Sequence, residues 1–279
     1  MMNVTLFQQK EWFPSLVLDK LNSTLVDFQE KHNQIERSNQ DGIRHLKAGV
    51  VVLLHYQNHC GYAFQLIKRS ANVAQAGDIS CPGGMLEIST DHMLEHILLK
   101  TDMVRFVNDK SLRRFPGTDE QTAFLIRLFL MNALREAWEE IGLSPLNVGF
   151  LGALPSYSLT LFSRTIFPVV ALVKEPYTPC LSDEVEKMLD IPISSFFEPS
   201  NYAMLEVCVD PKNSDSSASW HTPCLVLPDG NGTDDVLWGA TFNILTNFLK
   251  IIASDAFSVP SPRRSVQKIL NRNYAGRPR

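Results

Sequence analysis

The feature that most constrains this chain is an acidic helix end at residues 133–143, which reads Ala-Leu-Arg-Glu-Ala-Trp-Glu-Glu-Ile-Gly-Leu. At 3.6 residues per turn, Glu136, Glu139 and Glu140 are spaced i, i+3 and i+4, so they project from one side of a helix. Three neighbouring carboxylates repel one another, and Arg135 offsets only part of that repulsion. The cluster therefore either faces water or holds a cation, and ligands that are all oxygen atoms favour Mg²⁺ or Mn²⁺ over zinc.

The helix that carries these carboxylates is expected to be long. Thr118 is the expected N-cap of a capping box with Gln121, and Gly142 is a good C-terminal residue, so the helix would end at Ile141. Residues 124–131 are apolar around most of the helix circumference. We expect them to be buried either against an inserted helix or against a second subunit. The second alternative would make the protein a homodimer.

Apolar runs rich in branched and aromatic residues predict strands on both sides of this helix. The runs at 49–56 and 62–67 flank a turn-like segment and predict a hairpin or two neighbouring strands. The runs at 150–155 and 165–173 predict two further core strands. Alternation of strands and helices favours the α/β class.

The two ends of the chain are expected to lie outside this core. Residues 13–32 predict an amphipathic helix outside the catalytic core, and residues 32–42 predict a loop. After Phe257 the chain carries six basic residues and no acidic one, which predicts a solvated or disordered arm. We therefore expect an N-terminal helical extension at 1–47 and a basic tail at 254–279.

Composition excludes several classes of protein. With 279 residues, of which 44% are hydrophobic, the chain can bury a sizeable core, and its net charge of −4 argues against a non-specific nucleic-acid binder. No apolar run reaches the roughly 18 residues of a membrane span. The N-terminus does not resemble a signal peptide. The five cysteines form no C-x-x-C pair, which predicts reduced thiols and an intracellular location in a compartment that the sequence does not identify.

Residues 135–143 resemble the second half of the Nudix box, G-x5-E-x7-R-E-U-x-E-E-x-G-U, in which U is aliphatic. An upstream segment, Pro82-Gly83-Gly84-Met85-Leu86-Glu87, resembles the first half of the box. Gly84 and Arg135 are 51 positions apart instead of the 14 of the family pattern, so an insertion of 37 residues splits the box.

One position departs from the box pattern. The family has a glutamate six places after the box glycine, and this chain has Thr90 there. Glu87 and Asp91 are nearby acids, and either of them is a candidate to replace it.

The stretch before the box resembles the branch of the family that acts on coenzyme A, with the pattern L-L-T-x-R-S-x3-R-x3-G-x3-F-P-G-G. The matching residues are Leu66, Arg69, Ser70, Gly77, Pro82, Gly83 and Gly84. The chain departs from this pattern at Cys81, where phenylalanine is usual, and around residues 73–74, where the second arginine is missing. The stretch is also one residue shorter.

The resemblance implies a Nudix-type α/β/α sandwich with a mixed sheet over residues 48–253, interrupted by a helical insertion at 91–131. It also implies a hydrolase that cleaves the diphosphate linkage of a nucleoside diphosphate derivative with bound Mg²⁺ or Mn²⁺. The branch suggests coenzyme A or an acyl-coenzyme A, cleaved to 3',5'-ADP and (acyl-)4'-phosphopantetheine. The alternatives are a Nudix hydrolase of ADP-ribose or of a dinucleotide such as NADH, and a Nudix-fold binding module without turnover.

The expected site residues combine the acidic helix with this resemblance. The expected metal ligands are Glu136, Glu139, Glu140 and the carbonyl of Gly84, with Arg135 holding a glutamate in position. The residues expected against the substrate are Arg69, Ser70, Gly83 and Gly84. Glu184 belongs to a Glu-Val pair that resembles one common in the family; it would accept a proton or contact the metal, and the alternative is an ordinary loop glutamate.

Overall fold

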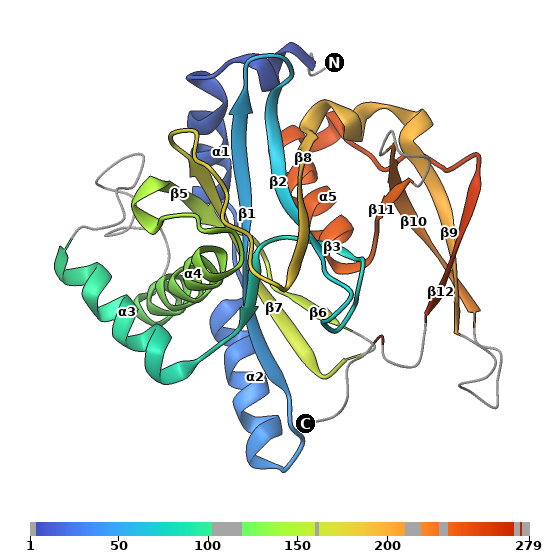
Figure 1. Cartoon of the computed structure of the whole chain (residues 1–279). Helices are drawn as coiled ribbons and strands as arrows, with labels where there is room; N and C mark the ends of the chain where they lie inside the picture. The colour runs from blue at the N-terminus through green and yellow to red at the C-terminus, as the bar shows by residue number, and fades with distance from the viewer. Residues whose placement is uncertain are drawn as a thin grey trace.

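The computed structural model describes residues 4–101, 119–159, 162–209, 219–228, 234–270 and 274. In this part of the chain the α-helices are α1 (Trp12–Asn22), α2 (Phe28–Gln40), α3 (Ile88–Thr101), α4 (Glu120–Ile141) and α5 (Gly239–Ala253). Short 3-10 turns cover Val4–Gln8, Pro145–Asn147, Ile193–Phe197, Pro199–Asn201 and Ser254–Ala256. Helices pack on both faces of a central sheet, and a second sheet lies beyond α5 (Figure 1).

The central sheet is mixed. Its strands are β1 (Leu46–Gln57), β2 (Gly61–Arg69), β3 (Ile79–Ser80), β4 (Gly83–Met85), β5 (Val148–Ala153), β6 (Tyr157–Leu159), β7 (Arg164–Val173) and β8 (Val185–Pro192). The order is β3-β2-β1-β7-β5, with β4 paired to β1, β6 to β7 and β8 to β2. β1 and β7 are parallel, from Leu46 opposite Arg164 onward, and the other pairs are antiparallel. The predicted hairpin of β1 and β2 is confirmed.

The central strand β1 changes its neighbour halfway along. Residues 53–57 pair with β2, whereas residues 48–50 pair with β4. Because β4 takes the place of β2 there, the far end of β2 is separated from β1 and continues with β3 and β8. The sheet therefore splits at the end where Arg69 finishes β2.

Aromatic packing fixes the layers. On one face, Phe129 of α4 stacks on Phe167 of β7 at 4.0 Å between ring centroids, and Phe28 of α2 meets Phe167 edge-on at 5.0 Å. On the other face, Phe248 of α5 meets Phe64 of β2 edge-on at 5.6 Å. The expected α/β/α sandwich with a mixed sheet is confirmed.

The N-terminal prediction was partly wrong. Residues 13–32 do not form one helix: they cover nearly all of α1, which ends at Asn22, and the start of α2, which begins at Phe28. The expected loop at 32–42 is largely α2. Phe13 and Val17 of α1 are fully buried in the core under the central sheet. α1 is therefore part of the core, because its apolar side chains cover the sheet beside α5.

The acidic helix agrees with the prediction except at its start. α4 ends at Ile141, and Gly142 follows in the left-handed conformation at φ 68°. The N-cap is Asp119, whose carboxylate accepts a hydrogen bond from Thr122 N–H at 2.9 Å. The predicted cap Thr118 lies outside the described residues. Of the expected insertion, the structure describes α3 and the first turns of α4, and these two helices pack together.

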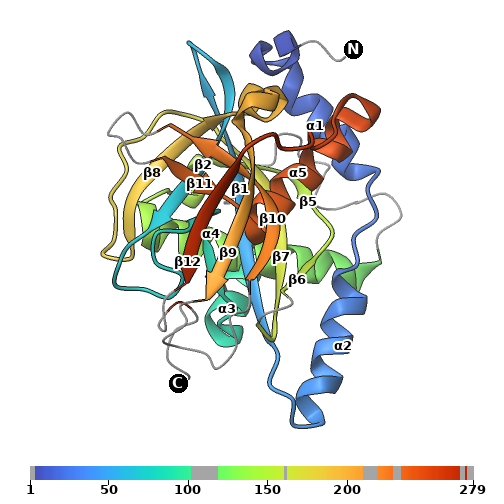
Figure 2. The same cartoon turned by 90° about the vertical axis from the view of Figure 1, so that its right-hand side faces the viewer.

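A second sheet was not predicted from the sequence. Its strands are β9 (Tyr202–Val209), β10 (Ser219–Leu227), β11 (Asp235–Leu237) and β12 (Ser265–Leu270), in the order β11-β10-β9-β12 (Figure 2). β12 pairs in parallel with β9, so the prediction of a solvated arm after Phe257 was wrong for this segment. The segment forms a strand because its side chains alternate between the two faces. Val266 and Leu270 pack on the second sheet, whereas the polar residues between them face outward or form hydrogen bonds.

In the described ranges no helix combines the length and the apolar character needed to cross a membrane.

Candidate active site

The two halves of the split motif meet in space. Gly83 of β4 donates its N–H to Glu140 Oε2 of α4 at 3.0 Å. Gly84 lies against the Glu136 carboxylate so closely that an added Cβ would stand 2.3 Å from Glu136 Cδ. The many residues between the halves therefore do not separate the glycine turn from the acidic helix.

Asn132 joins these parts, and the sequence analysis did not single it out. Its side chain is fully buried, accepts the Gly49 N–H at 2.7 Å and donates to the Met85 carbonyl at 3.0 Å. One amide thus ties α4 to β1 and to β4. A buried asparagine one turn before the acidic residues of an apolar helix was the available signal, since a buried amide requires partners.

Arg135 forms ion pairs with three acidic residues. Its Nε donates to Asp91 Oδ1 at 2.8 Å, and its other nitrogens pair with Glu136 at 3.1 Å and with Glu139 at 3.2 Å. Asp91 is fully buried and also accepts the Glu87 N–H at 2.8 Å. Glu87 and Asp91 were the candidates to replace the box glutamate that is missing at Thr90. Of these two acids, Asp91 is the one that contacts Arg135.

A cavity of 510 Å³ lies over this junction. The acidic residues that line it are Glu87, Glu136, Glu139, Glu140 and Glu184. Arg69, Arg135 and Arg164 line it as well, together with Gly83 and Gly84. Ser70 does not line it; its hydroxyl accepts a hydrogen bond from Asn72 N–H in the turn after β2. The structure thus gathers every expected site residue except Ser70 at one cavity, and it adds Arg164.

Burial governs the charge of the two inner carboxyls. Glu140 is only 5% exposed, and burial raises its pKa to about 8; the Gly83 N–H and Arg69 oppose this rise, and the charges of Glu136 and Glu184 add to it. Burial also raises the pKa of Glu136, against the effect of Arg135. Both groups resist ionisation on their own, and a bound cation would favour their charged forms.

The carboxylates fit a hard divalent cation only in part. Glu136 and Glu140 lie one helical turn apart and line one cavity, which suits an oxygen-ligated ion. Glu139 is 54% exposed and turns to Arg135. Among the described residues, no three histidine, cysteine or acidic side chains stand close enough to form a ready-made metal cluster. The expected set of three glutamates is therefore not assembled in this conformation.

Comparison with known proteins gives a partial similarity. No protein-family model matches it. Over 115 residues it is 34% identical to the peroxisomal coenzyme A diphosphatase ndx-8 of Caenorhabditis elegans, and this match covers 37% of the chain and 47% of that protein. The chain is therefore similar to this diphosphatase over part of its length. It spans about half the length of the curated relative that it matches.

Solved structures resemble the chain more weakly. A MutT/Nudix family protein from Enterococcus faecalis is 13% identical, with 82% of this chain and 76% of that chain covered at a TM-score of 0.40. A Caenorhabditis elegans Ap4A hydrolase is 16% identical, with 53% and 81% covered at a TM-score of 0.33. The Nudix domain of Shewanella oneidensis NrtR, complexed with ADP-ribose, is 15% identical, with 55% and 76% covered at a TM-score of 0.33.

A second cavity, of 320 Å³, adjoins the 510 Å³ cavity and extends towards the second sheet. The two share Arg69, Ser80 and Phe162 among their lining residues. The second cavity has an aromatic lining, contributed by Tyr157, Phe162, Trp220, Trp238 and Tyr274. A ligand in the 510 Å³ cavity would therefore have an adjoining aromatic space available to it.

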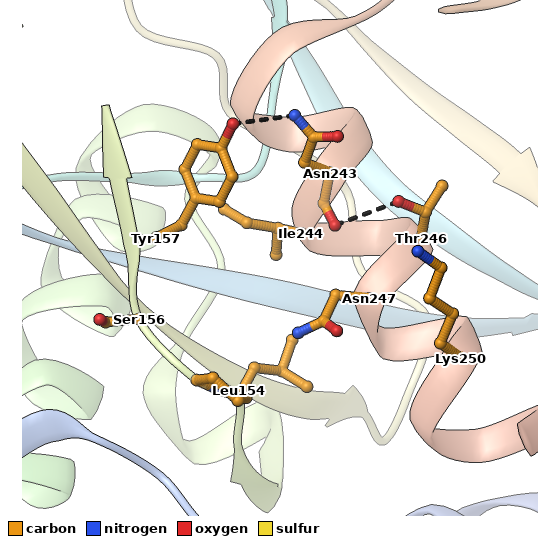
Figure 3. Close-up of a pocket in the computed structure, with 9 residues that line it drawn as sticks. Leu154, Ser156, Tyr157, Asn243, Ile244, Thr246, Asn247 and Lys250 are labelled. Atoms are coloured by element: carbon orange, nitrogen blue, oxygen red, sulfur yellow. Dashed lines mark hydrogen bonds between the residues drawn. The ribbon is translucent and has the colours of Figure 1, made fainter. Parts of the chain in front are cut away.

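A third hollow, of 420 Å³, lies between the segment Leu154–Tyr157 and α5 (Figure 3). Asn243 donates to Tyr157 Oη at 2.8 Å, and these two side chains line both this hollow and the aromatic cavity. Among the described residues that line it, Lys250 is the charged one. Its described lining thus differs from that of the 510 Å³ cavity, which includes five glutamates.

Proposed function

We propose that this chain hydrolyses the diphosphate linkage of a nucleoside diphosphate derivative with the help of bound Mg²⁺ or Mn²⁺. The observation that carries the proposal is the contact of the Gly83-Gly84 turn with Glu136 and Glu140 at one cavity. The similarity to a coenzyme A diphosphatase supports the same reaction class.

The residues divide the work as follows in this proposal. Glu136 and Glu140 hold the cation, with Glu139 and the Gly84 carbonyl as further ligands. When bound, a divalent ion neutralises diphosphate oxygens and lowers the pKa of a water molecule beside phosphorus. Arg135 fixes the glutamates through charge-assisted hydrogen bonds. Glu184, an exposed lining residue, accepts the proton of the attacking water.

Coenzyme A or an acyl-coenzyme A is the substrate that we propose, with 3',5'-ADP and (acyl-)4'-phosphopantetheine as products. The support is the coenzyme A diphosphatase activity of the relative together with the motif residues Arg69, Gly77 and Pro82. ADP-ribose and NADH use the same diphosphate chemistry, so they serve as the competing substrates in the test.

The test is a panel assay with product identification. Coenzyme A, acetyl-coenzyme A, ADP-ribose and NADH are each incubated with the protein and Mg²⁺ or Mn²⁺. We expect coenzyme A to be cleaved with the highest kcat/KM. Glu140→Gln should lower turnover by about a hundredfold or more, because the amide cannot serve as an anionic ligand.

Glu30→Gln is the matched control, since Glu30 lies on α2 and its carboxylate accepts a hydrogen bond from Gln34 at an exposed position. It should leave turnover unchanged. Absence of hydrolysis with either ion would contradict the proposed reaction, and full activity of Glu140→Gln would contradict the assigned metal site.

A further inference from the structure

Two guanidinium groups from different strands line the 510 Å³ cavity. Arg69 is the last residue of β2, and Arg164 is the first residue of β7. The pairing of β7 with Leu46 of β1 and Leu159 of β6 fixes the backbone of Arg164. Both side chains therefore reach the cavity from regular, well-anchored structure.

Among the described residues, no ion pair with a carboxylate is found for Arg164. Its Nε is buried and has no hydrogen-bond partner. Burial and the positive charge of Arg69 lower the pKa of the Arg164 guanidinium below its usual value. A half-buried cation beside a like charge destabilises the fold unless something else compensates it.

Arg69 also lacks an ion pair in the described part of the chain. Its Nε donates to the Ala74 carbonyl at 2.9 Å, which orients the side chain and leaves its charge uncompensated by direct contact. Ser80, whose Oγ is buried and has no partner either, lines the same cavity. The unused polar groups at this end of the cavity are thus two cations and one hydroxyl, a set that suits an anion.

We propose that Arg69 and Arg164 form a phosphate-binding pair that holds a phosphate group of the substrate; this inference rests on the proposed function. Planar guanidinium groups bind phosphate oxygens bidentately, and a multiply charged phosphate offsets two neighbouring positive charges at once. The phosphate is either part of the bridging diphosphate or a further phosphate ester on the nucleoside.

Binding tests the pair without requiring turnover. Inorganic pyrophosphate and adenosine 3',5'-bisphosphate are titrated calorimetrically, with Mg²⁺ present, into the wild type, Arg164→Met, Arg164→Lys and Arg37→Met. We expect Kd for at least one probe to rise about tenfold or more in Arg164→Met, as for loss of a charge-assisted hydrogen bond, and less in Arg164→Lys. Arg37→Met removes an exposed charge on α2 and should change Kd by less than about twofold.

Thermal unfolding separates a binding role from a structural one. If Arg164 serves binding, Arg164→Met removes an uncompensated buried charge, and Tm without ligand should stay constant or rise. A fall in Tm together with unchanged Kd would overturn the proposal. So would failure of the wild type to bind either probe.

Kinetics then identifies the phosphate. Equal increases in KM for coenzyme A and dephospho-coenzyme A in Arg164→Met support binding of the bridging diphosphate. An increase confined to coenzyme A supports binding of the additional phosphate ester. If the wild type binds the probes through Arg164 but hydrolyses no substrate, the proposed function fails while the phosphate site stands.

Discussion

Gly83 and Gly84 are adjacent in sequence but are constrained by different neighbours. A Cβ at Gly83 would lie 2.3 Å from the Gly49 carbonyl oxygen, and φ of +148° strains any other residue there. The three atoms nearest to a Cβ at Gly84 all belong to the end of the Glu136 side chain. Gly83 therefore allows the backbone of β4 to pack closely against β1, and Gly84 leaves space for the Glu136 carboxylate.

These two positions predict opposite phenotypes. Gly83→Ala should lower the free energy of unfolding by about 2 kcal/mol or more, because the backbone of β1 must shift. Gly84→Ala should leave stability nearly unchanged and lower Mg²⁺-dependent turnover about tenfold, because the Glu136 carboxylate is displaced. Urea unfolding and the diphosphatase assay on both variants measure this. A stable Gly83→Ala with an unfolded Gly84→Ala would refute the assignment.

At the scale of elements, α4 connects the site to α3. Besides the Arg135–Asp91 pair, Arg127 Nε of α4 pairs with Glu95 of α3 at 2.7 Å, and both acids are almost fully buried. Buried charges of this kind depend on their partners, because desolvation is otherwise uncompensated. The helix from the inserted segment is therefore fastened to the acidic helix by ionic contacts as well as by packing.

Asp91→Asn should destabilise the protein by about 3 kcal/mol, since it leaves the Arg135 guanidinium largely buried beside a neutral partner. Arg135 would also shift towards Glu136 and Glu139, so metal affinity should fall. Chemical denaturation and Mn²⁺ titration test both effects. Glu30→Gln, at an exposed position of α2, is the control and should change neither value; equal stability of the two variants would argue against a structural Asp91–Arg135 pair.

At the scale of the whole molecule, Asp78 links the two sheets. Its carboxylate accepts hydrogen bonds from Trp238 Nε1 at 3.1 Å, from Lys268 of β12 and from the Tyr274 hydroxyl. The Gln75 N–H also donates to the Tyr274 carbonyl at 2.8 Å. The segment between β2 and β3, which lines the cavity through Gln75, is thus held by the C-terminal part of the chain.

The double variant Lys268→Met, Tyr274→Phe should loosen this segment. We expect faster hydrogen exchange at residues 70–78, because two of the side-chain donors to Asp78 are lost, and an increase in KM of about threefold or more with kcat little changed. Lys250→Met, at an exposed lysine of α5, is the control. Unchanged exchange in the double variant would show that β12 does not order the cavity.

The sequence by itself determined what depends on neighbours along the chain. The spacing of Glu136, Glu139 and Glu140 with Gly142 beyond them defined the acidic helix and its end, and apolar runs located β1, β2, β5 and β7, because helix period, capping and β propensity are local.

Only the tertiary structure decided which distant segments meet. Strand pairing places Arg164 in the cavity, aligns β12 with β9 and brings the Gly83-Gly84 turn onto α4. These contacts depend on closing long loops against a shared core, and no local pattern encodes the partner. The burial that raises the pKa of Glu140 likewise exists only once the sheet and the helix are packed together.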